Sequence, residues 1–196
     1  MLRVVVYTAK RYERAMRAVV AGGLVGAPAV LTSPPVIDDN IVGDPTLLED
    51  GGVLVLNLHG RPLYETWFGD GDLPAIHATT LASLDLRGVG VFAINCYAGD
   101  DGAMRRALWA ARPDYVVSGR GINWGGAASP IGADLLLRWF LRGVARGMMA
   151  EAAIERAKRL TYLLHPRLTV MQREALRDTL EFTLMRAEGE DKQWTQ

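Results

Sequence analysis

Short apolar segments alternate with segments of helical periodicity over the first two thirds of the chain. The apolar segments are rich in Val, Ile and Leu on both faces, as expected for strands buried in a parallel sheet, and they comprise residues 2–8, 27–35, 52–60, 89–96 and 114–119. Helical spacing of apolar positions marks residues 9–22 and 100–113. The alternation predicts an α/β fold, a three-layer α/β/α sandwich with a mostly parallel central sheet.

The remaining third changes to continuous helical periodicity. Helices are predicted over residues 131–147, 148–164 and 168–187, and residues 61–88 are predicted to be irregular. No internal repeat or linker interrupts the pattern. We therefore expect one domain over residues 1–188, followed by a polar tail over residues 189–196.

Composition excludes several classes of partner. Lys and Arg together number 22, and Asp and Glu together also number 22, so the formal net charge is zero. No broad basic surface for nucleic acid is expected. The apolar stretch 18–31 is broken by Gly and Pro and is too short to span a membrane. The chain begins without a signal-peptide pattern and has a single Cys, which indicates a reducing, cytoplasmic compartment.

His59 and the single cysteine, Cys96, each follow an apolar run: "VLVLNLHG" ends in His59 and Gly60, and "VGVFAINC" ends in Cys96. The carboxyl ends of parallel strands meet at one edge of a sheet, where functional groups gather. We therefore expect the imidazole and the thiol to emerge at the same edge, with peptide N–H groups exposed at Gly60 and Gly99.

An imidazole beside a thiol has a chemical use. A thiol is mostly protonated at neutral pH, and a neighbouring base or the positive end of a helix generates the thiolate nucleophile. The helix predicted after Cys96 provides such an end. The alternative is structural: a lone Cys is often a small core residue, and a lone His before Gly is often a turn residue.

Other chemistries lack a motif. His77 lies at an expected helix start and His165 precedes Pro166 at a helix end, so no cluster of metal ligands is expected. A Walker-type phosphate loop is absent from the sequence. We expect no metal and no cofactor.

The segments "LNLHG" and "FAINCYAG" resemble the His-Gly and Cys blocks of caspase-like (clan CD) cysteine peptidases. The resemblance is closest to CHAT-domain proteases, because it continues through the Trp-bearing loop and the helices after it, and it covers roughly residues 50–165. It does not include the caspase signature QAC followed by R, Q or G and then G. Caspase specificity for aspartate is therefore not implied.

This resemblance implies roles for individual residues. His59 is the general base, Cys96 is the nucleophile, and the backbone N–H groups of Gly60 and Cys96 hold the oxyanion. The resemblance also implies a protein or peptide substrate and activation by a partner, a ligand or processing. A third residue that orients His59 is not evident from the sequence.

The resemblance places the substrate pocket in two loops, 34–44 and 118–126. In the first loop Asp38, Asp39 and Asp44 are candidates for selecting a basic residue, although aspartates in such a loop also serve turns. In the second loop Arg120 is a candidate for selecting an acidic residue, and Asn123 and Trp124 are candidates for the pocket wall.

The sequence thus favours a cysteine endopeptidase with a His-Cys dyad and an acyl-thioester intermediate. Two alternatives stay open. One is a related amide hydrolase or transpeptidase that uses the same acyl route. The other is a catalytically silent caspase-like α/β module that binds a partner protein.

Overall fold

The computed structural model describes residues 2–23, 26, 28–36, 51–164 and 170–186. Its main sheet contains β1 (Val4–Ala9), β2 (Ala29–Ser33), β3 (Val53–Asn57), β6 (Gly90–Ala93), β7 (Tyr115–Ser118) and β8 (Thr183–Met185). Its α-helices are α1 (Glu13–Gly22), α3 (Ala78–Ser83), α4 (Ala103–Ala110), α5 (Ala133–Val144), α6 (Ala150–Leu163) and α7 (Val170–Leu180). A short 3-10 helix, η1 (Lys10–Tyr12), joins β1 to α1.

The main sheet has six strands in the order β2-β1-β3-β6-β7-β8. The first five run parallel and β8 pairs antiparallel with β7. The strands form where the sequence has runs of apolar and β-branched residues, and the four central ones are almost wholly buried. The predicted α/β architecture with a mostly parallel central sheet is therefore confirmed.

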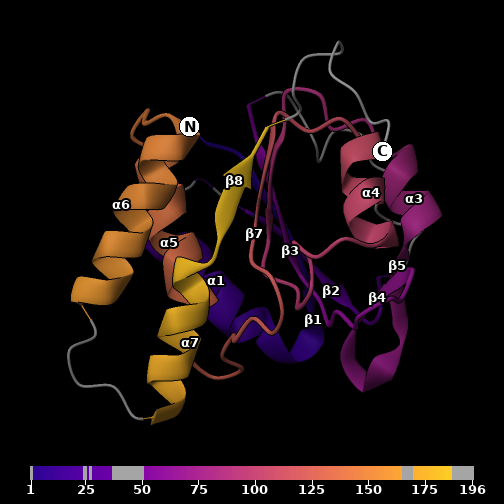
Figure 1. Ribbon diagram of the computed structural model, residues 1–196, viewed down its shortest axis with the longest axis horizontal. Helices are drawn as coiled ribbons and strands as arrows, with labels where there is room; N and C mark the ends of the chain where they lie inside the picture. The colour runs from indigo at the N-terminus through magenta and orange to yellow at the C-terminus, as the bar shows by residue number, and fades with distance from the viewer. Residues whose placement is uncertain (1, 24–25, 27, 37–50, 165–169, 187–196) are drawn as a thin grey trace.

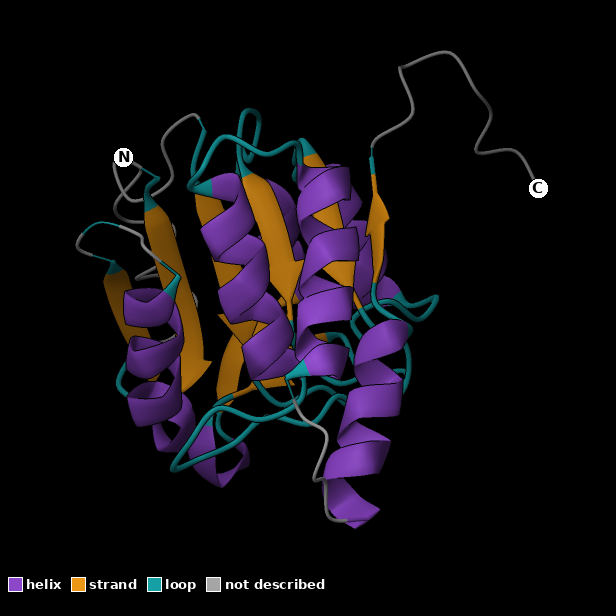
Figure 2. Cartoon of the chain, turned by 90° about the vertical axis from the view of Figure 1, so that its left-hand side faces the viewer, coloured by secondary structure: helices purple, strands orange, loops and turns teal. Residues whose placement is uncertain are grey.

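Alternation along the central strands divides the core into two layers. Val5 and Tyr7 of β1 pack on one face with α3 and α4. Val4 and Val6 pack on the other face with α1, α5 and α6. Figure 1 shows the sheet between these two helical layers, and Figure 2 looks onto the layer that contains α5 and α6, with the strands behind it. The predicted three-layer sandwich is present.

We expected residues 61–88 to be irregular, and this prediction is wrong. The segment contains β4 (Thr66–Phe68), the 3-10 helix η3 (Asp70–Asp72), β5 (Pro74–His77) and α3. β4 and β5 form a separate antiparallel pair. Strands of three and four residues are too short to show a period. They form because Trp67, Ala75 and Ile76 are buried in the core beneath them.

The predicted C-terminal boundary of the helix over residues 168–187 is also wrong. The helix stops at Leu180, and the chain then enters β8, which pairs Leu184 with Val117. Phe182 is fully buried and stacks on Phe92 with the ring centroids 5.8 Å apart. The gain from burying this ring and pairing the edge of β7 outweighs the local helical spacing.

Replacing Phe182 tests how firmly β8 is attached. Phe182→Ala should reduce the free energy of unfolding by about 3–5 kcal/mol, because it leaves a cavity against Phe92. Leu180→Ala, at a side chain that is 44% exposed, is the control and should cost less than about 1 kcal/mol. Denaturant unfolding measures both; equal losses in the two variants would contradict the docking of β8.

Candidate active site

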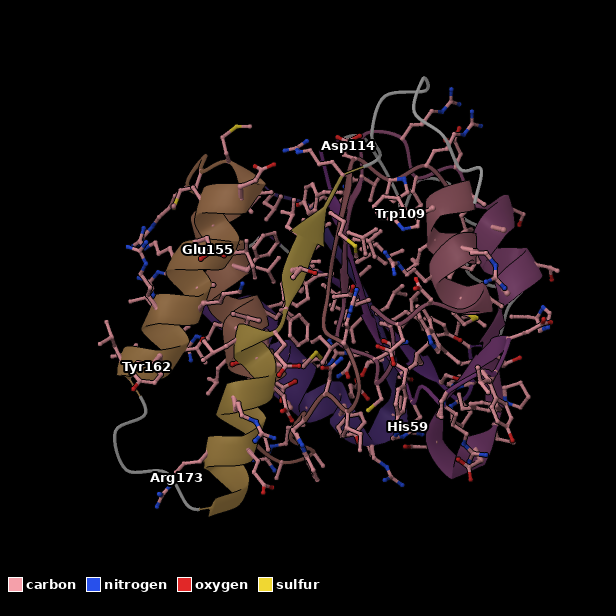
Figure 3. The ribbon with its side chains drawn as sticks, viewed as in Figure 1. His59, Trp109, Asp114, Glu155, Tyr162 and Arg173 are labelled. Atoms are coloured by element: carbon pink, nitrogen blue, oxygen red, sulfur yellow. The ribbon has the colours of Figure 1, made fainter. Side chains whose placement is uncertain are left out.

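The ends of two neighbouring parallel strands bring His59 and Cys96 together. Leu58 separates His59 from β3, and Ile94 and Asn95 separate Cys96 from β6. β3 and β6 pair with Leu56 opposite Ala93. The same register continued past the ladder sets His59 opposite Cys96. In Figure 3, His59 lies at the opposite end of the sheet from Asp114, which precedes β7, so it lies at the carboxyl edge.

The backbone of Gly60 lies directly against the backbone of Cys96. A Cβ added to Gly60 would lie 1.8 Å from the Cys96 carbonyl oxygen, closer than any side chain permits. Only glycine therefore fits at position 60 with the two loops in this arrangement. In the part of the chain that the structure describes, neither the Gly60 N–H nor the Cys96 N–H donates to a backbone carbonyl. The Gly99 N–H, which was expected to be exposed, donates instead to the Gly119 carbonyl at 3.0 Å.

Two asparagines hold the loop that bears Cys96. The side-chain oxygen Oδ1 of Asn95 accepts a hydrogen bond from Leu58 N–H at 3.2 Å, in place of the β3–β6 ladder. Asn123 donates from Nδ2 to the Asn95 carbonyl at 2.8 Å. Both asparagines are buried. The strand end that carries His59 and the loop that carries Asn123 are therefore tied to the Cys96 loop.

The Cys96 thiol is not activated in this arrangement. Its hydrogen bond goes to the Asn123 carbonyl at 3.5 Å. Burial raises the pKa of the thiol, and the backbone hydrogen bonds that lower it are smaller effects. The helix expected to lower this pKa begins only at Ala103. Because the pKa of the thiol is raised overall, the thiol and not the thiolate is the favoured form in this structure.

His59 is fixed through its backbone. It exchanges two hydrogen bonds with Phe68 of β4, His59 N–H to Phe68 O at 2.7 Å and Phe68 N–H to His59 O at 2.9 Å. The Tyr12 ring lies 5.5 Å from the imidazole, centroid to centroid. Burial lowers the pKa of His59 most, Arg11 lowers it further, and Asp70 and Asp72 raise it. The imidazole is therefore neutral near pH 7.

Asp70 lies beside His59 and binds Arg11, and no sequence pattern predicted either residue at the site. His59 Nε2 lies 3.9 Å from Asp70 Oδ1. Arg11 donates to the same carboxylate twice, from its backbone N–H to Oδ2 at 2.6 Å and from Nε to Oδ1 at 2.8 Å. Asp70 belongs to the segment expected to be irregular, and Arg11 to a segment expected to be regular helix, so no local pattern joined them to His59.

The residues predicted for the substrate pocket differ in whether the structure describes them and in how exposed they are. Asp38, Asp39 and Asp44 lie outside the described residues. Arg120 is exposed and Trp124 is 36% exposed. Asn123, by contrast, is buried and its side chain holds Asn95. The pocket itself stays a prediction.

A buried carboxyl group supports the loop that carries Trp124. Asp134, in the first turn of α5, accepts hydrogen bonds at Oδ2 from Gly126 N–H at 2.6 Å and from Ile131 N–H at 3.1 Å. Its Oδ1 has no partner within the described residues. Burial raises the pKa of Asp134 to about 7, more than the two backbone donors lower it.

Across the described ranges, no three His, Cys, Asp or Glu side chains cluster so as to hold a metal ion. No helix in those same ranges is long and apolar enough to cross a membrane. His77 is the N-cap of α3 and accepts a hydrogen bond from Thr79 N–H, which confirms the expected helix start; His165 lies outside the described residues.

No protein-family model matches this chain, and no curated protein sequence matches it significantly. Among solved structures, gingipain R, an Arg-specific cysteine proteinase, aligns with 94% of this chain at a TM-score of 0.61 and 8% sequence identity. The chain spans 46% of that structure's chain. A flavodoxin from Streptococcus pneumonia TIGR4 aligns with 75% of this chain and 99% of its own, at 16% identity and a TM-score of 0.40, too low to carry an argument. The similarity to gingipain R establishes a caspase-like fold.

Gly60→Ala tests the contact between the two loops. The added methyl group overlaps the Cys96 carbonyl oxygen, so the loops must separate, and we expect a loss of about 1–3 kcal/mol in the free energy of unfolding. Gly102→Ala is the control, because a Cβ there meets open space at an ordinary extended φ; it should lose less than about 1 kcal/mol, the cost of a poorer N-cap. Equal losses would contradict the contact.

Asp134 predicts a dependence of stability on pH. Its pKa in the fold, about 7, exceeds the usual 3.8, so its contribution to stability is complete below about pH 4 and is lost as the pH rises through about 7. Relative to Asp134→Asn, the wild-type free energy of unfolding should fall between pH 5 and 7 by up to about 1.4 kcal/mol per pH unit. Parallel pH profiles from denaturant unfolding would contradict the raised pKa.

Proposed function

We propose that this chain is a cysteine endopeptidase in which His59 is the general base and Cys96 the nucleophile. The observation that carries the proposal is the contact of Gly60 with the Cys96 backbone. It joins the strand end that bears His59 to the loop that bears the Cys96 thiol. The caspase-like fold supports the same reading.

The proposed reaction proceeds in two halves. Cys96 Sγ attacks the carbonyl carbon of a peptide bond while its proton passes to His59, and the N–H groups of Gly60 and Cys96 bind the resulting oxyanion. The C–N bond then breaks, His59 returns the proton to the leaving amine, and an acyl-thioester remains. Water, deprotonated by His59, attacks the thioester and releases the acid and the thiol.

We propose that the free chain is latent and that a partner protein, a ligand or processing activates it. The support is electrostatic: burial raises the pKa of the Cys96 thiol and so disfavours the thiolate. The CHAT-domain resemblance and a cytoplasmic location belong to this proposal. Asp38, Asp39 and Arg120 remain the candidates for choosing the charge of the substrate residue, with Asn123 and Trp124 at the pocket wall.

A second candidate function is a catalytically silent module that binds a partner protein. The same observations favour it, because the pKa shifts leave both His59 and Cys96 neutral near pH 7. A related amide hydrolase or transpeptidase shares the proposed acyl-thioester and differs only in its substrate.

Covalent labelling tests the proposal. The protein is incubated with peptidyl acyloxymethyl ketones that carry Arg, Lys, Asp, Asn or Leu at the reactive end, and intact mass is recorded. We expect one adduct on the wild type, none on Cys96→Ala, and labelling at least about a hundredfold slower on His59→Ala, since a lost general base costs about 10²–10⁴. Preference for one end residue would identify the pocket charge.

His77→Ala is the matched control, because His77 caps α3 and lies outside the pair; it should label as the wild type does. Equal rates in the wild type and His59→Ala would mean an ordinary thiol and would contradict the dyad. No adduct on a folded wild type, with or without a cell extract that supplies partners, would favour the silent module.

A further inference from the structure

We propose that Asp70 is a positioning residue for His59: its carboxylate keeps the proton of the neutral imidazole on Nε2 and so leaves Nδ1 as the base. The inference rests on the proposed use of His59 as a base. Nε2 is the ring nitrogen that faces Asp70, at 3.9 Å from Oδ1. A carboxylate accepts a proton donor and repels a lone pair, so it selects the tautomer with hydrogen on Nε2.

The fold delivers Asp70 to the imidazole through the element that fixes His59. His59 is bridged to Phe68 by two backbone hydrogen bonds, and Asp70 follows Phe68 after one residue, Gly69. Gly69 N–H donates to the Leu73 carbonyl at 2.8 Å, which closes the turn. A Cβ at Gly69 would lie 2.4 Å from Ser33 Oγ, so the turn is packed tightly against the end of β2. The β4–β5 hairpin therefore binds the backbone of His59 and also carries the carboxylate of Asp70.

Arg11 fixes the carboxylate from the other side. Its backbone N–H and its Nε each donate to a different oxygen of Asp70, at 2.6 and 2.8 Å. Two donors from one residue restrain both the position and the rotation of the carboxylate. Each oxygen keeps a second lone pair, and the lone pair of Oδ1 is available to Nε2.

The charges around His59 oppose one another. Arg11 and burial lower its pKa, whereas Asp70 and Asp72 raise it. The other ionisable groups that face this cluster are the Tyr12 phenol, whose pKa burial raises, and the Cys96 thiol, whose pKa burial raises. Asp70, at 25% exposed, and His59, at 30% exposed, are sheltered enough for their attraction to exceed that of an open surface pair.

The role of Asp70 in catalysis follows from the proton path. When the S–H bond of Cys96 breaks, the proton binds Nδ1 and the ring becomes an imidazolium with hydrogen on both nitrogens. Asp70 stabilises this cation through Nε2–H and does not itself take the proton. The Nδ1 proton then passes to the leaving amine as the C–N bond breaks, and the neutral tautomer is restored.

Titration of the imidazole by NMR tests the inference without a substrate. The chain has three His, so His77→Gln and His165→Gln assign the signal of His59 in the full-length protein. Asp70→Asn should lower the pKa of His59 by about one unit, because the neighbouring anion is lost. Asp72→Asn is the matched control: Asp72 lies in the same 3-10 helix, is 67% exposed and pairs with Arg61, and its loss should shift the pKa by less than half as much.

Arg11→Gln should shift the pKa of His59 in the opposite direction. This variant replaces Asp70→Asn as the test if Asp70→Asn folds poorly. Removing the guanidinium should raise the pKa of His59, because Arg11 lowers it. A mere loosening of the site would relieve burial and raise this pKa in every variant. A pKa that rises or stays unchanged in Asp70→Asn, or that falls in Arg11→Gln, overturns the inference.

The rate of labelling by the ketone probes gives the second readout. Asp70→Asn should label at least about tenfold more slowly than the wild type near pH 7, and Asp72→Asn should label normally. A lowered pKa together with slow labelling supports both proposals. A lowered pKa in a chain that no probe labels supports the coupling of Asp70 to His59 and counts against the peptidase function.

Discussion

The contact of Gly60 with the Cys96 carbonyl is the constraint on which the site depends. Two parallel strands that neighbour each other in a sheet diverge beyond the ladder unless something holds their ends. Here the missing side chain of Gly60 lets the two backbones meet, and Asn95 replaces a ladder hydrogen bond with a side-chain one. Base and thiol are brought to one edge by backbone geometry, so their placement does not need a direct bond between them.

In this arrangement, the placement of His59 and Cys96 does not by itself produce the charged forms of the two side chains. The backbone holds the reactive residues close, yet the thiol donates to Asn123 and burial disfavours its charge. The imidazole is neutral for the same physical reason. A neutral pair becomes an ion pair only if water is replaced by better partners for both charges.

The placement of His59 and Cys96 at one edge of the sheet could be predicted from the sequence. Apolar runs end at His59 and Cys96, and parallel strands in an α/β sheet meet at one edge. Asp70 could not be predicted, because β2, β3 and β4 separate it from its partner Arg11 along the chain and β4 is only three residues long. The raised pKa of the thiol could not be predicted because it depends on burial in the folded chain. β8 was missed because antiparallel pairing with β7 is non-local.

Hydrogen bonds tie the loop that follows β7 to the Cys96 loop and to α5. Gly121 O accepts from Tyr97 N–H at 2.6 Å and Gly119 O accepts from Gly99 N–H at 3.0 Å. Asn123 Nδ2 binds the Asn95 carbonyl, and Gly126 N–H binds the buried Asp134. Trp124 lies between the last two attachments. The carbonyl that accepts from the Cys96 thiol belongs to Asn123, the residue before Trp124. The backbone beside the predicted pocket residue Trp124 therefore contacts the thiol directly, so a movement of this loop changes the surroundings of Cys96.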